Sequence, residues 1–275
     1  MGFAYSTNAF MNYSLEEAIE QIKEIGFDAV EIMADRPHLY PPDYGVEKLA
    51  ELKKKLDTLR LQVSNLNTFT LFAVGDMHHP SWIEKEEKKR LVRIQHTKNC
   101  LSLAAKLGCA NISIQPGGKV EHFSPEESME IFLGGLSQVI PDAKRLGVKI
   151  LVEPEPDLLM ENAAQFEQFL ARVDTSIVGL NCDIGHFHCV GDDPIEVIKK
   201  FAPVIGHIHI EDIRNRVHDH KICGHGDIDF VPIFDALHKI CYNGFISLEL
   251  YPYQDNPVEA GRESLELLKR VCEVR

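Results

Sequence analysis

The sequence predicts a single (β/α)8 barrel over residues 1–275, and three observations point to it. Short β-rich runs alternate with amphipathic helical stretches from end to end, and eight such units can be counted. Strands that alternate with helices of this length imply a parallel sheet, and eight units imply that the sheet closes on itself. The length of 275 residues is ordinary for one such barrel. No G-x-G-x-x-G motif follows the first strand, which disfavours an open doubly wound sheet.

The first half of the chain shows four of these units. Ser14 and Glu17 form a capping-box pattern at the start of the first helix, and Gly26 ends that helix. A longer loop at residues 68–82 follows the third strand and is expected to shape the pocket. Strands are expected at residues 3–6, 29–32, 61–66 and 110–114. Helices are expected at residues 15–25 and 46–59 and in a charged stretch that ends near Leu107.

The second half repeats the pattern without a change in composition that would indicate a domain linker. Strands are expected at residues 148–153, 178–183, 205–210 and 245–250. Helices are expected at residues 125–146, 163–173, 194–201, 231–240 and 257–271. The expected architecture is therefore one barrel domain that includes the whole chain.

The amino-acid composition disfavours some classes of binding partner. The net charge of −13 opposes attraction to nucleic acid or to an anionic membrane. No apolar run approaches the roughly 20 residues that a membrane span needs. Seven cysteines are present and none forms a C-x-x-C pair, which indicates reduced core cysteines and predicts a cytoplasmic protein. A small-molecule substrate is the partner that this balance favours.

Four side chains able to bind a metal lie at or near the ends of four consecutive predicted strands: Glu153, Asp183, His209 and Glu249. The C-terminal ends of barrel strands are where catalytic groups sit, and the two-residue period of a strand turns all four side chains inward. Three converging carboxylates would repel one another, and a divalent cation resolves that conflict. Mn²⁺, Co²⁺, Zn²⁺ and Mg²⁺ all suit such ligands. The alternative is that each residue is a hydrogen-bonded core residue.

Further polar residues fall near the same end of the predicted barrel. His186 follows the sixth strand, and His218 and His220 lie in the loop after the seventh. Gln115 ends the fourth strand on the same rim. Loop histidines are often merely solvated, but several clustered after two neighbouring strands indicate a site. These residues are therefore candidates for contact with a substrate.

The chain resembles the xylose-isomerase-like TIM-barrel superfamily of sugar and sugar phosphate isomerases and epimerases. The resemblance extends over essentially the whole chain, with ketose 3-epimerases and inosose isomerases as relatives and endonuclease IV as a more distant one. It implies that the four strand-end residues bind one divalent metal ion. It further implies that Glu153 and Glu249 move a proton on opposite faces of the substrate and that His186 contacts substrate oxygens. The segments that carry it are 152–154, 183–186, 207–212, 224–230 and 247–250.

One departure from the family pattern concerns His220. The sugar epimerases usually have an arginine there that holds substrate, whereas endonuclease IV has a zinc-binding histidine. Endonuclease IV also has a histidine where this chain has Gln115 and an aspartate where it has His218. The resemblance therefore leaves open an additional metal ion bound through His186, His218 and His220.

The leading functional hypothesis is a divalent-metal-dependent isomerase or epimerase that acts on a small sugar or polyhydroxy carbonyl compound through an enediolate. Glu153 and Glu249 would be its acid–base pair, and His186, His220 and Gln115 would contact the substrate. A zinc phosphodiesterase resembling endonuclease IV, a dehydratase of the same superfamily and a barrel without enzymatic activity are the alternatives. The resemblance also leaves a homo-oligomer open, because dimers and tetramers are common among relatives.

Overall fold

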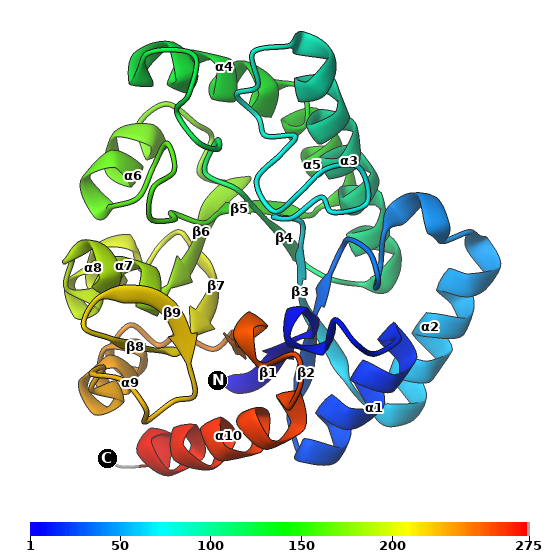
Figure 1. Ribbon diagram of the computed structural model, residues 1–275, viewed down its shortest axis with the longest axis vertical. Helices are drawn as coiled ribbons and strands as arrows, with labels where there is room; N and C mark the ends of the chain where they lie inside the picture. Colours follow the sequence, from blue (N-terminus) through cyan, green and yellow to red (C-terminus); the bar gives the residue numbers. More distant parts are fainter. Residues whose placement is uncertain (274–275) are drawn as a thin grey trace.

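The computed structural model describes residues 1–273 and contains a closed eight-stranded barrel, which confirms the predicted fold class. Every neighbouring pair of barrel strands is parallel, and β1 pairs with both β2 and β10, which closes the sheet. The helices lie around the strands (Figure 1). In barrel order the strands are β1 (Gly2–Ser6), β2 (Ala29–Met33), β3 (Gln62–Asn67), β4 (Asn111–Ile114), β5 (Lys149–Val152), β6 (Val178–Asp183), β7 (Ile205–Ile210) and β10 (Phe245–Leu248).

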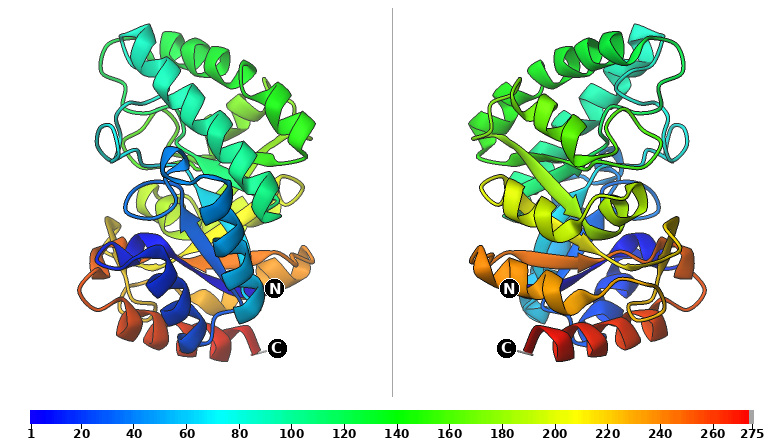
Figure 2. Two further views of the ribbon diagram at one scale, coloured as in Figure 1. Left: turned by 90° about the vertical axis from the view of Figure 1, so that its right-hand side faces the viewer. Right: turned by 90° about the vertical axis from the view of Figure 1, so that its left-hand side faces the viewer.

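The helices begin and end close to where the sequence predicts them. Ser14 and Glu17 form the expected reciprocal capping box, and Gly26 ends α1 with a φ of 105°. Helix α10 packs beside α1, as both side views in Figure 2 show. No helix within residues 1–273 has the length and apolar character needed to span a membrane. The outer helices are α1 (Leu15–Ile25), α2 (Val46–Leu59), α3 (Glu87–Leu107), α4 (Pro125–Ser137), α5 (Ile140–Leu146), α6 (Ala163–Leu170), α8 (Pro194–Phe201), α9 (Phe230–Lys239) and α10 (Pro257–Glu273).

One predicted helix is in fact two. The continuous helix expected at residues 125–146 ends at Ser137, and α5 begins at Ile140. Pro141 explains the break, since proline has no N–H to donate and its ring collides with the carbonyl four residues earlier. Pro141 is tolerated in the first turn of α5, where that N–H would lack a partner in any case.

Two segments expected to be loops have regular structure. The residues after β6 form a short helix, α7 (Ile184–Val190), and Asp183 caps it by accepting a 2.7 Å hydrogen bond from the His186 N–H. The residues after β7 form an antiparallel hairpin of β8 (Asp212–Arg214) and β9 (Val217–Lys221). Its turn residues, Asn215 and Arg216, both have positive φ, which suits the right-handed twist of a hairpin. Two-residue alternation in β9 puts His218 and His220 on one face.

Alternating side chains separate the hydrophobic core from the barrel interior. Ile208 and Ile210 of β7 belong to the core between the strands and the outer helices. His207 and His209, which alternate with them, are also buried, but both contact Glu31 of β2. The interior near the C-terminal ends of the strands is therefore polar, and this is where the candidate site lies.

Candidate metal centre

The four residues singled out at strand ends converge. One ligand atom from each of Glu153, Asp183, His209 and Glu249 lies within 4.8 Å of all the others, and all four side chains are buried. The Nδ1 atom of His209 is 2.7 Å from Glu153 Oε1, 3.6 Å from Glu249 Oε2 and 3.8 Å from Asp183 Oδ2. Asp183 and His209 belong to β6 and β7, whereas Glu153 and Glu249 directly follow β5 and β10. We call these four residues the quartet.

The charge balance of the quartet fits a cation. Burial raises the pKa of Glu153 above its usual value; the neighbouring His209 lowers it, and the Asp183 carboxylate raises it. Burial likewise raises the pKa of Glu249 well above its usual value. The buried Asp183 Oδ2 has no hydrogen-bond partner in residues 1–273, nor does a lysine or arginine there pair with any quartet carboxylate. A divalent ion would neutralise this negative charge, and the Asp183 Oδ2 atom could then coordinate the ion.

Glu31 lies behind His209, and the sequence reasoning missed it. Its Oε2 atom is 2.8 Å from Nε2 of both His207 and His209. Burial alone would raise the pKa of Glu31, but His209 and His207 lower it well below its usual value. Burial alone would lower the pKa of His209, but Glu153, Glu31 and Glu249 raise it well above its usual value. A metal ion at the quartet would take the place of the Nδ1 proton, while Nε2 keeps donating to Glu31. The available signal was a glutamate inside the apolar run of residues 29–33.

Three histidines form a second cluster beside the quartet. The Nε2 atoms of His186, His218 and His220 lie 3.0, 3.1 and 3.3 Å from one another. The Nδ1 atoms of His186 and His220 contact the backbone carbonyls of Pro154 and Glu249, at 3.0 and 2.9 Å. Burial lowers the pKa of all three rings, that of His220 to about 3. The two backbone contacts favour the Nδ1–H tautomer in His186 and His220, which directs their Nε2 lone pairs at the point that His218 Nε2 also faces.

Two links join the histidine cluster to its surroundings. Asp183, His186, His220 and Glu249 also lie within 4.8 Å of one another, so the cluster shares two carboxylates with the quartet. Glu155 lies behind the cluster, with Oε2 3.2 Å from His186 Nδ1 and Oε1 3.7 Å from His218 Nδ1. Burial raises the pKa of Glu155 well above its usual value. Sequence reasoning stopped at Glu153 and missed this second glutamate of the Glu-Pro-Glu segment.

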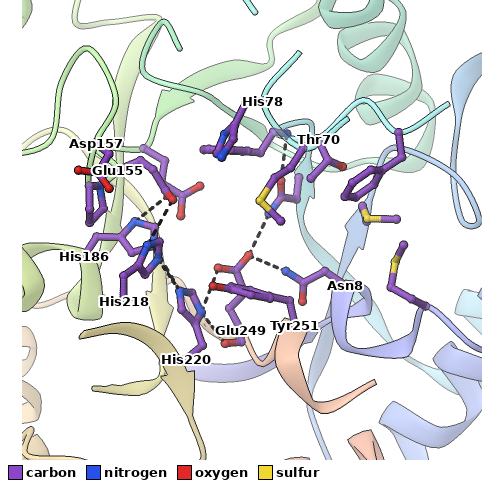
Figure 3. A pocket seen from close by; sticks show the side chains of 18 of the residues that line it. Asn8, Thr70, His78, Glu155, Asp157, His186, His218, His220, Glu249 and Tyr251 are labelled. Carbon is purple, nitrogen blue, oxygen red and sulfur yellow. Dashed lines mark hydrogen bonds and ion pairs between the residues drawn. The ribbon is translucent and has the colours of Figure 1, made fainter. Parts of the chain in front are cut away.

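A cavity of about 250 Å³ opens onto both sets of ligands. Glu153, Glu249 and the three histidines line it, and Figure 3 shows the histidines together on one side with Asn8 and Thr70 on the other. Asn8 donates a 2.8 Å hydrogen bond to Glu249 Oε1. Gln115 is not among the described residues that line this cavity. Its buried amide donates to the carbonyls of Met77 and His78 and supports the loop above.

Comparisons with known proteins agree with this architecture. A family model described as "Xylose isomerase-like TIM barrel" matches residues 19–271. An inosose dehydratase of Clostridium botulinum is 26% identical over 288 residues, covering 95% of this chain and 91% of that protein. A D-tagatose 3-epimerase-like protein superimposes with a TM-score of 0.80 at 22% identity, covering 98% of this chain and 99% of that one. The IOLI protein with a binding zinc atom superimposes with a TM-score of 0.82 at 22% identity, and the match covers 99% of this chain and 98% of that one.

Proposed function

The chain belongs to the xylose isomerase-like TIM-barrel family, and we propose that it is a divalent-metal-dependent isomerase or epimerase of a small sugar or polyhydroxy carbonyl compound. The observation that carries this proposal is the convergence of Glu153, Asp183, His209 and Glu249 at a cavity at the C-terminal end of the barrel. The similarity to an inosose dehydratase and to a D-tagatose 3-epimerase-like protein supports sugar-like substrates.

The quartet is the set of residues that would hold the metal ion. Its three carboxylates and one imidazole suit Mn²⁺, Co²⁺, Zn²⁺ or Mg²⁺, and the zinc atom in the similar IOLI protein supports a divalent ion. When bound, such an ion supplies electrostatic stabilisation of the negative charge that develops on substrate oxygens as a carbon-bound proton leaves. The Glu31 contact keeps the His209 ring in the orientation that this ligation needs.

Glu153 and Glu249 are the proposed acid–base pair. Both side chains line the cavity, so both can reach a bound substrate. Burial raises the pKa of each carboxyl, which brings both groups nearer to the range where a carboxylate takes up a proton and a carboxylic acid returns it. The amides of Asn8 and Asn67 donate to Glu249 Oε1 at 2.8 and 3.2 Å and fix its orientation. One glutamate would take the proton from carbon, and the other would return a proton.

Solvent-deuterium uptake tests this function. Metal-loaded protein in D₂O would be incubated with a panel of ketoses and inososes, and carbon-bound deuterium would be measured by NMR and mass spectrometry. The expected result is deuterium at a carbon next to the carbonyl group in at least one compound, and its loss in Glu249→Gln. Absence of uptake across the panel, with the metal ion bound, would contradict the proposal.

We further propose that the histidine cluster binds an additional divalent ion. Three converging neutral imidazoles suit Zn²⁺, Co²⁺ or Cu²⁺ better than Mg²⁺, because nitrogen donors favour those ions. Metal counting by elemental analysis and native mass spectrometry should find two ions per chain in the wild type and one in His218→Ala. One ion per chain in both proteins would contradict the additional site.

A dehydratase would use the same acid–base groups, and the similarity to an inosose dehydratase favours this second candidate function. Loss of water from an inosose, detected as a product 18 mass units lighter, distinguishes this reaction from epimerisation. A zinc phosphodiesterase is favoured by the histidine cluster but disfavoured by the net charge of −13. Cleavage of DNA containing abasic sites by the zinc-loaded protein would support that alternative.

A further inference from the structure

The side of the cavity formed by the ends of β1, β2 and β3 differs in chemistry from the metal centre. Met33 ends β2, Met11 follows the 3-10 turn η1 (Thr7–Phe10), and Phe69, Phe72 and Met77 belong to the loop after β3. We call these five residues the apolar wall. Phe72 and Met77 are 40% and 38% exposed, so two large apolar side chains stand at the rim of the cavity. Exposed apolar groups beside a cavity are typical of a surface that a ligand covers.

Several polar atoms next to the apolar wall already have partners inside the protein, whereas buried Asn8 Oδ1 and His78 Nδ1 in the same cavity have none within residues 1–273. The Thr70 hydroxyl donates to Asp35 Oδ2 at 2.9 Å. Asn67 Oδ1 accepts from the Phe69 N–H at 3.0 Å, and its amide donates to Glu31 and Glu249. A substrate hydroxyl or phosphate placed against Thr70 and Asn67 would lose its water and find few free partners in these two side chains, which disfavours binding there. An apolar group placed here would lose only unfavourable hydration.

Two fully buried charged residues hold the loop that carries most of the apolar wall. Asp35 accepts hydrogen bonds from the backbone N–H groups of Phe72 and Ala73, at 2.5 and 3.1 Å. Arg93 donates to the carbonyls of Thr68, Phe69 and Pro80, at distances from 2.8 to 3.0 Å. The wall is therefore preformed and not assembled by a mobile loop, and a preformed apolar surface selects ligands by shape.

We propose that the substrate carries an apolar alkyl or aryl substituent next to its metal-binding polyhydroxy carbonyl part, and that this substituent packs on the apolar wall. This inference rests on the proposed function, because the quartet must anchor the oxygen-rich part. The cavity of about 250 Å³ suits a head group of monosaccharide size, and the exposed positions of Phe72 and Met77 let the substituent extend to the rim. The substrate class is then a sugar-like compound with an apolar conjugate.

Three hydroxamic acids test the substituent, because all present the same pair of adjacent oxygens to a metal ion. Acetohydroxamate carries a methyl group, benzohydroxamate a phenyl ring and threonohydroxamate a polyhydroxylated chain. Titration calorimetry with the metal-loaded protein would compare their dissociation constants. We expect benzohydroxamate to bind at least tenfold more tightly than either of the others.

Two variants locate the effect on the apolar wall. The double variant F72S/M77S should lose most of the preference for benzohydroxamate and keep its affinity for acetohydroxamate. Val74→Ser is the matched control, because Val74 is exposed in the same loop but does not line the cavity, and it should keep the full preference. Thermal unfolding would verify that both proteins are folded.

The outcomes separate this inference from the proposed function. Equal affinities for the three compounds, or tighter binding of threonohydroxamate, would overturn the apolar substituent and leave the metal-dependent function standing. An undiminished preference in F72S/M77S would also overturn it. If none of the three compounds binds, that result would contradict both the metal-dependent function and the apolar substituent.

Discussion

The two sides of the barrel mouth have opposite chemistry. The side formed by β5, β6, β7 and β10, with the β8–β9 hairpin, presents the quartet and the histidine cluster. The side formed by β1, β2 and β3 presents methionine and phenylalanine side chains, with Asn8, Asn67 and Thr70 as its polar members. One ring of parallel strands thus carries the proposed metal-binding and acid–base groups on one half and a shaped apolar surface on the other.

Different hydrogen bonds hold the two sides of the barrel mouth in place. The metal side depends on hydrogen bonds within the barrel interior, where Glu31 of β2 contacts His209 of β7. The apolar side depends on Asp35 and Arg93, which bind the backbone of one loop. Asn67 links the two sides, because its amide donates to Glu31 and Glu249 while its Oδ1 accepts from the Phe69 N–H. The other supports are separate, so we expect changes in the apolar wall to leave the metal side largely independent. The predictions that follow test that independence.

The largest effect is expected on the acid–base side. Glu249→Gln removes the carboxylate but keeps its size and its contact to Asn8, so deuterium exchange should slow by about 10²- to 10⁴-fold. Met33→Leu, a conservative change in the apolar wall, should slow exchange less than about threefold, because volume-conserving swaps are tolerated well. Rates measured by NMR in D₂O check both. Equal slowing in the two variants would contradict a division of roles between the two sides.

The second effect concerns stability on the apolar side. Arg93→Met leaves the carbonyls of Thr68, Phe69 and Pro80 without their buried donor, which should lower the free energy of unfolding by roughly 3 kcal/mol. Urea denaturation measures that change. Affinity for metal at the quartet should stay within about threefold, because no quartet residue contacts Arg93. A large loss of metal affinity in this variant would show that the two sides are coupled.

The third effect concerns metal binding through Glu31. Glu31→Gln removes the charge that orients His209, and substitutions of this kind weaken metal affinity by about 10- to 100-fold. Competition with a chromophoric chelator measures the dissociation constant. Glu47→Gln, an exposed position in the first turn of α2, is the control and should have no effect. An unchanged dissociation constant in Glu31→Gln would contradict the role assigned to this contact.

The smallest effect is a pH dependence on the apolar side, remote from the metal ligands. Burial lowers the pKa of His38 to about 4 and that of His96 to about 3. Below about pH 6.5 both histidines are protonated in the unfolded chain but stay neutral in the folded protein. The free energy of unfolding therefore falls as the pH falls from about 6.5 toward 4. Each ring contributes up to about 1.4 kcal/mol per pH unit in that range. Urea denaturation of the metal-free protein at pH 7, 6 and 5 measures the slope, and His38→Gln should reduce it. An identical slope in that variant would contradict the assignment.

The sequence predicted the metal side of the site better than the apolar side, for a physical reason. A charged residue that closes an apolar strand, such as Glu153 after residues 148–152, is conspicuous because burial of an unpaired charge is costly. Met33 and Phe69 in similar positions look like ordinary core residues. Whether such a side chain fills the core or faces a cavity depends on contacts between distant segments, which a linear pattern does not contain.

The fold followed from local signals except where those signals were weak. Eight strands and the capped helix α1 were predicted close to their observed positions. The β8–β9 hairpin was missed because its turn uses Asn215 and Arg216 and lacks the glycine that usually indicates such a turn. Glu31 was missed because its partners, His207 and His209, lie more than 170 residues away in the sequence.

The most direct test of this division is a crystal structure of the metal-loaded protein with benzohydroxamate, with anomalous scattering used to locate the metal ion. We expect an anomalous peak about 2.0–2.2 Å from His209 Nδ1 and from oxygens of Glu153, Asp183 and Glu249. The phenyl ring should lie against Met33 and Phe72. An anomalous peak away from the quartet, or a ring directed toward the three histidines, would contradict it.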